Sequence, residues 1–185
     1  MTHSDTYLAF MMDHAAGNHA EPFALAGDVH VLLSATGAET ADLWSIIGGV
    51  LLEDGPPEVA KESSAPRSLH KTRGTATRAE DLIRERIQGA RWRKGLFGIQ
   101  YAPAGPRGAK LMKLNAGQSV PAHGHKHLEA TVVLSGQFSD GHGTYGPGDL
   151  VLGEPGKRHK PRAVGDDPCI CLVAQKPNPL WGWLI

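Results

Sequence analysis

The sequence contains little cysteine and no excess of charge of either sign. Its only cysteines are Cys169 and Cys171, and 19 lysine and arginine residues balance 19 aspartate and glutamate residues. The two cysteines lie two residues apart in one expected strand, where they are poorly placed to bond each other. A reducing cytoplasm is therefore the simplest setting. The balanced charge gives no general electrostatic reason to expect binding to nucleic acid or to an anionic membrane surface.

Long apolar runs are also missing. No segment approaches about eighteen consecutive apolar residues, so no transmembrane helix is expected. The opening residues, MTHSDTYLAF, lack a basic segment followed by an apolar run and are not expected to act as a signal peptide. A glycine-rich phosphate loop and a serine–histidine–acid set are absent from the sequence as well. The 185 residues have room for one ample domain or two small ones.

Residues 1–55 show the apolar spacing of a small helical domain. One helix is expected over Thr6–His14, a second from Glu21, where the following proline suits a first turn, and a third over residues 40–55. The third helix carries apolar residues on one side, namely Leu43, Ile46, Ile47, Val50 and Leu51. Packing between the helices is expected from Leu8, Phe23, Val29, Leu32, Leu43 and Ile46.

The composition changes after the helical region. Residues 56–76 are rich in proline, serine and charged residues and lack apolar periodicity, which predicts a linker. A short helix follows, in which Thr77 and Glu80 have the spacing of a capping box. From Trp92 onward, short alternating segments such as EATVVLSGQFS are separated by turns such as YGPGD. Residues 77–185 are therefore expected to form a β sandwich or small barrel preceded by a short helix, so the chain is mainly β.

The histidines are numerous, and the most informative ones lie close together. His123, His125 and Glu129 are separated by even numbers of residues within an apolar alternation that predicts a β-strand. Side chains at such spacing point to the same face, so the two histidines would stand about 6.6 Å apart at roughly 3.3 Å per residue. Both imidazoles could then bind one metal ion. A neighbouring strand ending in His159 is the expected source of a fourth ligand.

This stretch resembles the first motif of the cupin family, G-x5-H-x-H-x3-E-x6-G. Every fixed position of that motif is met, by Gly117, His123, His125, Glu129 and Gly136. Five fixed positions in one motif are far more specific than an isolated H-x-H. The resemblance implies a C-terminal jelly-roll barrel with one divalent metal ion inside it.

The second cupin motif, G-x5-P-x-G-x2-H, follows in the expected order. It is met by Gly148, Gly156 and His159, whereas Glu154 stands at the place of the proline and Ala163 at that of a trailing asparagine. Taken together, the two motifs imply that the metal ligands are His123, His125, Glu129 and His159. Three imidazoles and a carboxylate suit zinc, or iron, manganese or nickel with open coordination positions.

Three further residues are candidates for roles beside the metal. His127 shares the parity of the expected ligands, so it would serve as a spare ligand, a hydrogen-bonding partner or a proton carrier, unless a strand bulge turns it to solvent. Cys169 and Cys171 share one face of a strand. Facing inward they would line the pocket and be open to oxidation during sensing, and otherwise they are small core residues.

The whole arrangement is similar to one cupin subgroup, the ChrR-type anti-sigma factors. In these proteins a small helical zinc domain holds a group IV sigma factor, and a C-terminal cupin regulates its release. The similarity extends over the segments VVLSGQFSD, YGPGDL and RHKPRAVGDDPCICLV, and over AAG at Ala15–Gly17 near the N-terminus. For the cupin metal, the subgroup favours zinc.

The helical half departs from the pattern of that subgroup. In that subgroup, the zinc of the helical domain is bound by an upstream histidine and an H-x3-C-x2-C set. In this sequence His30 matches the histidine of the set, but Ser34 and Gly37 stand at the cysteine positions. The upstream position falls near Asp5, with His3 close by. Because a structural zinc site needs four good ligands, no zinc is expected there, and His30 is expected to pack at a partly buried helix face.

The resemblance implies a cytoplasmic, metal-binding regulator. It would sense oxidative stress or a small ligand at the cupin metal and control a group IV sigma factor through its N-terminal helices, without direct contact to nucleic acid or membrane. The alternative is a metal-dependent cupin oxygenase that acts on a small molecule with the same ligands on iron. A homodimer is compatible with either function.

Overall fold

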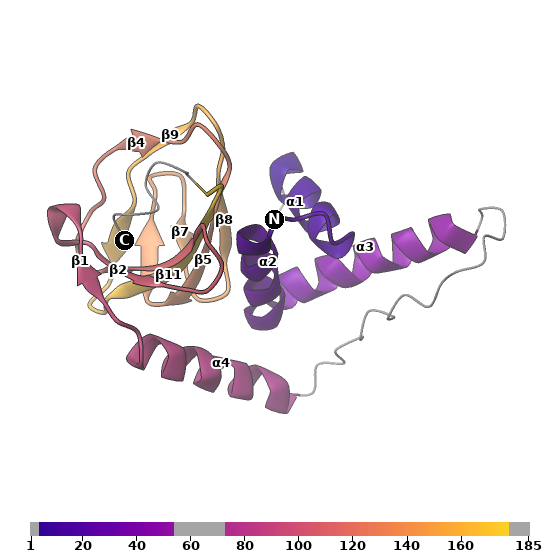
Figure 1. The fold of residues 1–185 in the computed structure, drawn as a ribbon, viewed down its shortest axis with the longest axis horizontal. Coiled ribbons are helices and arrows are strands. Elements are labelled where there is room, and N and C mark those ends of the chain that lie inside the picture. Colours follow the sequence, from indigo (N-terminus) through magenta and orange to yellow (C-terminus); the bar gives the residue numbers. More distant parts are fainter. Residues whose placement is uncertain (1–3, 54–72, 178–185) are drawn as a thin grey trace.

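The computed structural model describes residues 4–53 and 73–177, which form a helical unit beside a β domain (Figure 1). The helical unit consists of α1 (Asp5–Ala15), α2 (Glu21–Leu33) and α3 (Ala35–Glu53). A separate helix, α4 (Arg73–Gln88), precedes the first strand. No helix among these described residues is long and apolar enough to cross a membrane.

The β domain is antiparallel, as the alternating segments predicted, and its strands form three sheets. The largest sheet has the strand order β1 (Arg93–Lys94), β2 (Gln100–Pro103), β3 (Ala109–Leu114), β11 (Cys169–Gln175), β5 (Glu129–Ser135) and β8 (Leu150–Gly153). A second sheet has the order β10 (Arg162–Val164), β6 (Gln137–Ser139) and β7 (Thr144–Tyr145). The third pairs β4 (His123–Gly124) with β9 (Arg158–His159), and a short 3-10 helix, η1 (Leu96–Gly98), joins β1 to β2.

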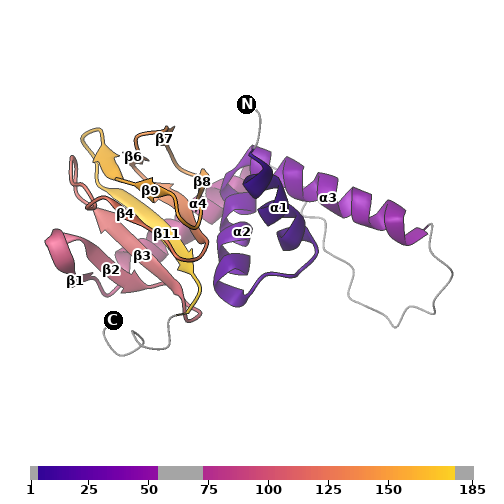
Figure 2. The same ribbon diagram turned by 90° about the horizontal axis from the view of Figure 1, so that it is seen from above.

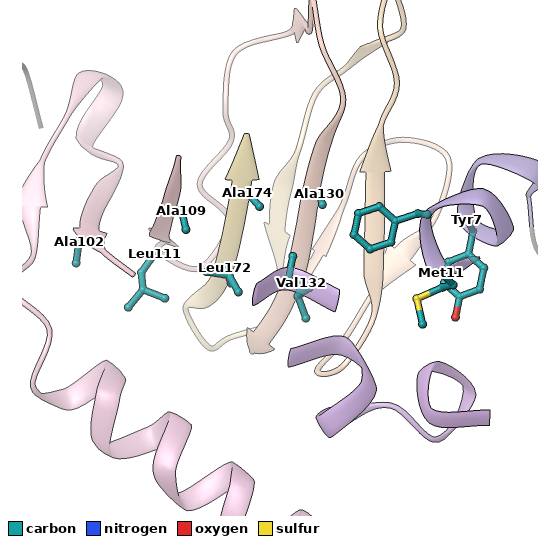
Figure 3. Packing of buried hydrophobic residues seen from close by; sticks show 11 residues of the cluster. Tyr7, Met11, Ala102, Ala109, Leu111, Ala130, Val132, Leu172 and Ala174 are labelled. Carbon is teal, nitrogen blue, oxygen red and sulfur yellow. The ribbon is translucent and has the colours of Figure 1, made fainter. Parts of the chain in front are cut away.

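One apolar core joins the helical unit to the large sheet, with α2 between the sheet and the other two helices (Figure 2). Its buried members, drawn as sticks in Figure 3, are Tyr7, Phe10, Met11, Ala26, Ala102, Ala109, Leu111, Ala130, Val132, Leu172 and Ala174. Leu8, Phe23 and Val29 pack against this cluster, as the helical spacing predicted. Alanines on β2, β3, β5 and β11 lie in this shared core, where their small side chains leave room for close packing.

The predicted packing of α3 is wrong at two positions. Leu43 and Ile46 were expected in the helical core, but their exposed fractions are 55% and 64%. The helix also begins at Ala35, five residues earlier than expected. Its start is set by Ser34, which has an extended backbone and whose Oγ accepts a hydrogen bond from Gly37 N–H at 3.2 Å, the geometry of a helix N-cap.

The helix before the β domain is longer than the sequence predicted. Its backbone is helical from Arg73, so the last four residues of the expected linker belong to α4 and Thr77 lies inside the helix rather than at its cap. The rest of the expected linker, residues 56–72, lies outside the described residues. Polar composition around residue 75 had favoured a linker, because a helix with few apolar residues has little periodicity to detect.

His30 connects the two units directly. It is 3% exposed, and its Nδ1 lies 2.7 Å from the carbonyl oxygen of Gly148, in the turn before β8. Its Nε2 lies 3.0 Å from the hydroxyl of Tyr7 on α1. If Nδ1 donates to Gly148, Nε2 is left to accept from Tyr7, so one neutral imidazole satisfies a group on each side. Gly148 has a φ of +90°, and a Cβ there would lie 2.8 Å from the carbonyl oxygen of Leu33.

Replacing His30 with alanine should destabilise the protein by about 2–4 kcal/mol. The change leaves the buried carbonyl of Gly148 without this donor and creates a cavity between α2 and the sheet. Urea unfolding followed by circular dichroism measures the loss. His142→Ala, at an exposed turn position, is the matched control and should change the free energy of unfolding by less than about 0.5 kcal/mol. Equal effects of both variants would contradict a linking role for His30.

Candidate metal centre

Three histidines meet where β4 pairs with β9. The register of this pair sets His123 directly opposite His159. His125 forms an isolated parallel bridge with Pro155, which lies in the segment just before β9. The structure therefore brings together His123, His125 and His159, three of the four ligands that the cupin motifs predicted.

The imidazoles converge through their Nε2 atoms. His159 Nε2 lies 2.9 Å from His125 Nε2 and 3.1 Å from His123 Nε2, and one ligand atom from each residue lies within 4.8 Å of the others. Around a metal ion with bonds of about 2.0–2.1 Å, neighbouring nitrogens are separated by roughly 3.0–3.4 Å. The nitrogen spacing and the chemistry of the donor set thus fit a divalent metal ion of this size.

Two features, one at His123 and one at His159, suit these residues to bind a metal ion through Nε2. His123 Nδ1 lies 2.9 Å from the carbonyl oxygen of Pro121, and donation to that oxygen leaves Nε2 unprotonated toward the other rings. Burial, together with His123 and His125, lowers the pKa of His159, although Glu129 opposes the shift. A neutral ring can direct its lone pair to a metal, whereas a protonated ring cannot.

Glu129, the fourth expected ligand, lies beside the three histidines rather than among them. It is the first residue of β5 and is 8% exposed. Its Oε1 lies 3.5 Å from His125 Nε2, and its Oε2 accepts a hydrogen bond from the side-chain amide of Gln175. Gln175 is opposite Glu129 in the β11–β5 register. Gln175 was not among the residues predicted from the sequence, although alternation along β11 places it on the same face as Cys171 and Val173.

The other sequence candidates occupy different environments. His127 is exposed in the bend between β4 and β5. Cys169 and Cys171 are both buried free thiols, with sulfur atoms 3.6 Å apart. The hydrogen bond between the two thiols, together with burial, raises the pKa of Cys171 well above its ordinary value. Of these three residues, only Cys171 lines the cavity next to the histidines.

The histidines open into a cavity of about 290 Å³ inside the β domain. Its polar lining includes Tyr101, Lys110, His123, His125, Glu129, Thr131, His159 and Gln175. Its apolar lining includes Met112, Leu114, Val120, Phe138, Val151 and Val173. Gly153 lies against the ring of His125, where a Cβ would come within 3.0 Å of Cδ2, and it pairs with Glu129 across β5 and β8. A metal held by the three histidines would therefore face an internal space.

The positions that match a zinc site in the helical unit serve other purposes here. His30 contacts Tyr7 and Gly148, and Ser34 caps α3. A Cβ on Gly37 would lie 2.8 Å from the ring of His30, so this position is closely packed. Asp5 is the exposed first residue of α1, and His3 lies outside the described residues.

Comparison with known proteins bears out the resemblance inferred from the motifs. A family model described as the ChrR cupin-like domain matches residues 86–179. The anti-sigma-E factor ChrR of Cereibacter sphaeroides is 32% identical over 184 residues, covering 90% of this chain and 86% of that protein. The crystal structure of Rhodobacter sphaeroides SigE in complex with the anti-sigma ChrR matches with a TM-score of 0.73 and 31% identity, covering 95% of this chain and 99% of the matched chain. Both the helical unit and the β domain lie within this similarity, and the chain belongs to the ChrR cupin-like family.

Proposed function

We propose that this protein is an anti-sigma factor whose helical unit binds a group IV sigma factor. The observation that carries the proposal is an exposed apolar face on α3, which is called the α3 face below. It consists of Leu43, Ile46, Ile47, Val50 and Leu51, with exposed fractions of 55%, 64%, 37%, 54% and 70%. The spacing of these residues follows one side of a helix.

An apolar helix face of this kind is unfavourable in water. Burying one such side chain fully is worth about 1.5–3 kcal/mol, and contiguous exposed apolar residues commonly mark a protein interface. Much of α3 extends beyond α1 and α2, away from the β domain (Figures 1 and 2). The similar ChrR protein is seen in complex with SigE, which supports a sigma factor as the partner of the α3 face.

We further propose that the β domain binds one divalent metal ion per chain through His123, His125, His159 and Glu129. Zinc is favoured by the relationship to ChrR, and iron, manganese or nickel suit the same donors. When bound, the ion would supply a Lewis acid and a link between β4 and β9. Glu129 would reach it by a modest shift, since its carboxylate already lies beside His125.

Regulation would act through changes at this centre. Entry of a reactive oxygen species or a small ligand into the cavity would alter the packing of the β domain on the helices. Cys171 lines the cavity and contacts Cys169, so this pair is a candidate for oxidation, whereas the exposed His127 is better suited to a surface role. Two buried free thiols suit a reducing cytoplasm.

The helical unit is proposed to hold together without zinc. The shared apolar core and the buried contacts of His30 with Tyr7 and Gly148 take the place of a metal cross-link. A metal-dependent oxygenase is the second candidate function, because the cavity leaves room for a small molecule beside the histidines.

Replacing Ile46 and Val50 together with aspartate should weaken sigma-factor binding by at least about 100-fold. Two charges buried in an apolar interface cost several kcal/mol, and each factor of ten corresponds to about 1.4 kcal/mol. Affinity is measured by calorimetry between the full chain and a group IV sigma factor from the same organism. Leu96→Asp, at a residue 79% exposed on the β domain, is the control and should bind normally. Unchanged binding by the double variant would refute the role of the α3 face.

The purified protein should contain about one metal ion per chain, and His123→Ala with His159→Ala should remove most of it. Loss of two imidazoles leaves too few donors to compete for a divalent ion. Elemental analysis gives the stoichiometry, with His127→Ala as the control that keeps its metal. Metal content unaffected by the double variant would contradict the ligand set. A reproducible second ion retained by that variant would instead point to a metal site in the helical unit.

A further inference from the structure

A lysine side chain enters the cavity that holds the three histidines. Along β3, Lys110 alternates with Met112 and Leu114 on the cavity side, while Leu111 faces the shared core. Lys110 Nζ lies 5.1 Å from the centroid of the Tyr101 ring, which also lines the cavity. An ammonium group over an aromatic ring is held in place, yet the ring does not neutralise its charge.

No carboxylate of the described residues lies within salt-bridge distance of Lys110, and no hydrogen bond to its ammonium is seen among them. Glu129 is the acidic group that interacts electrostatically with Lys110, but the two carboxylate oxygens of Glu129 already face Gln175 and His125. Burial lowers the pKa of Lys110, and Glu129 opposes that shift only in part. A partly desolvated ammonium without an anionic partner is costly, so this position favours an anion brought in from outside.

The rest of the lining indicates the size and character of that anion. A cavity of about 290 Å³ has the volume of about ten water molecules at roughly 30 Å³ each, which suits a molecule of about ten non-hydrogen atoms. The rest of the lining is largely apolar and includes Met112, Leu114, Val120, Phe138, Val151 and Val173. An inorganic anion would leave these walls uncovered, whereas an organic anion would cover them.

We propose that the cavity binds a small organic carboxylate, whose charge is paired with Lys110 and whose apolar body packs against the aliphatic and aromatic walls. Carboxylate binding would add a ligand to the proposed regulator and does not depend on sigma-factor binding. It is related to the proposed metal ion only because the carboxylate and the metal ion would occupy the same cavity. Lys110 would then determine specificity for a charged ligand over a neutral one of the same shape.

The test uses the full-length protein as purified, with its metal content measured, and two pairs of probes that differ mainly in charge. Benzoate is compared with benzamide, and hexanoate with hexanamide, by calorimetric titration. At least one carboxylate should bind with a Kd below about 1 mM, and its amide should bind roughly 10-fold more weakly or worse, because a charge-assisted contact is lost. Equal binding of acid and amide, or no binding of either acid at this concentration, would overturn the proposal.

A matched pair of variants assigns the effect to one residue. Lys110→Met keeps the length and apolar stem of the side chain and should reduce carboxylate affinity roughly 10-fold or more, with amide affinity unchanged. Lys113→Met is the control, because it removes the same charge from the same strand. Lys113 Nζ lies over the ring of Trp92, 5.9 Å from its centroid. This variant should bind carboxylates as the unchanged protein does. Equal losses in both variants would contradict a specific role for Lys110.

Metal analysis of each sample separates this inference from the proposed function. Lys110→Met should keep its metal, because no ligand has been removed. If the protein contains one metal ion but binds no carboxylate, the proposed ligand class is wrong and the proposed regulatory function is unaffected. Protein that contains no metal, but binds carboxylates in a Lys110-dependent manner, supports the ligand class and refutes the metal centre.

Discussion

The antiparallel pairing of β4 with β9 is the interaction on which the candidate metal centre depends. It sets His123 opposite His159, which is 36 residues away in the chain, and it brings His125 alongside through the bridge to Pro155. Each of these strands has only two residues, so their own hydrogen bonds contribute little. The larger sheet provides the rigid support, because Glu129 and Gly153 lie next to the histidines at the ends of β5 and β8.

The helical unit depends on the β domain in a comparable way. Its core is shared with the large sheet, and His30 bonds across the junction rather than within the helices alone. The two positions that carry cysteines in the related pattern have local structural roles here: Ser34 is the N-cap of α3, and Gly37 fits against the ring of His30. Packing against the sheet therefore contributes to the cohesion of the helices, together with the contacts that the helices make with one another.

Sequence patterns predicted the parts of this structure that depend on local spacing. The interval between His123 and His125, and the alternation in the strands, follow from backbone geometry. Periodicity also identified the apolar side of α3, but it could not show that Leu43 stays exposed, because a pattern does not reveal what covers it. Contacts between residues distant in the sequence were not predicted. They include the hydrogen bond from Gln175 to Glu129 and the position of Lys110 in the cavity. Neither residue belongs to a recognisable motif.

Strand β8 connects the three histidines of the candidate metal centre with helix α2, which are distant in sequence. At one end Gly153 is paired with Glu129 and lies under the ring of His125, and at the other the turn at Gly148 is bonded to His30. Strand β8 has four residues and is about 13 Å long at roughly 3.3 Å per residue. A strand paired in register cannot slide by one residue without reversing its side chains. A displacement at the histidine end would therefore have to tilt β8 rather than slide it, and α2 would then either follow the tilt or lose the hydrogen bond between His30 and Gly148.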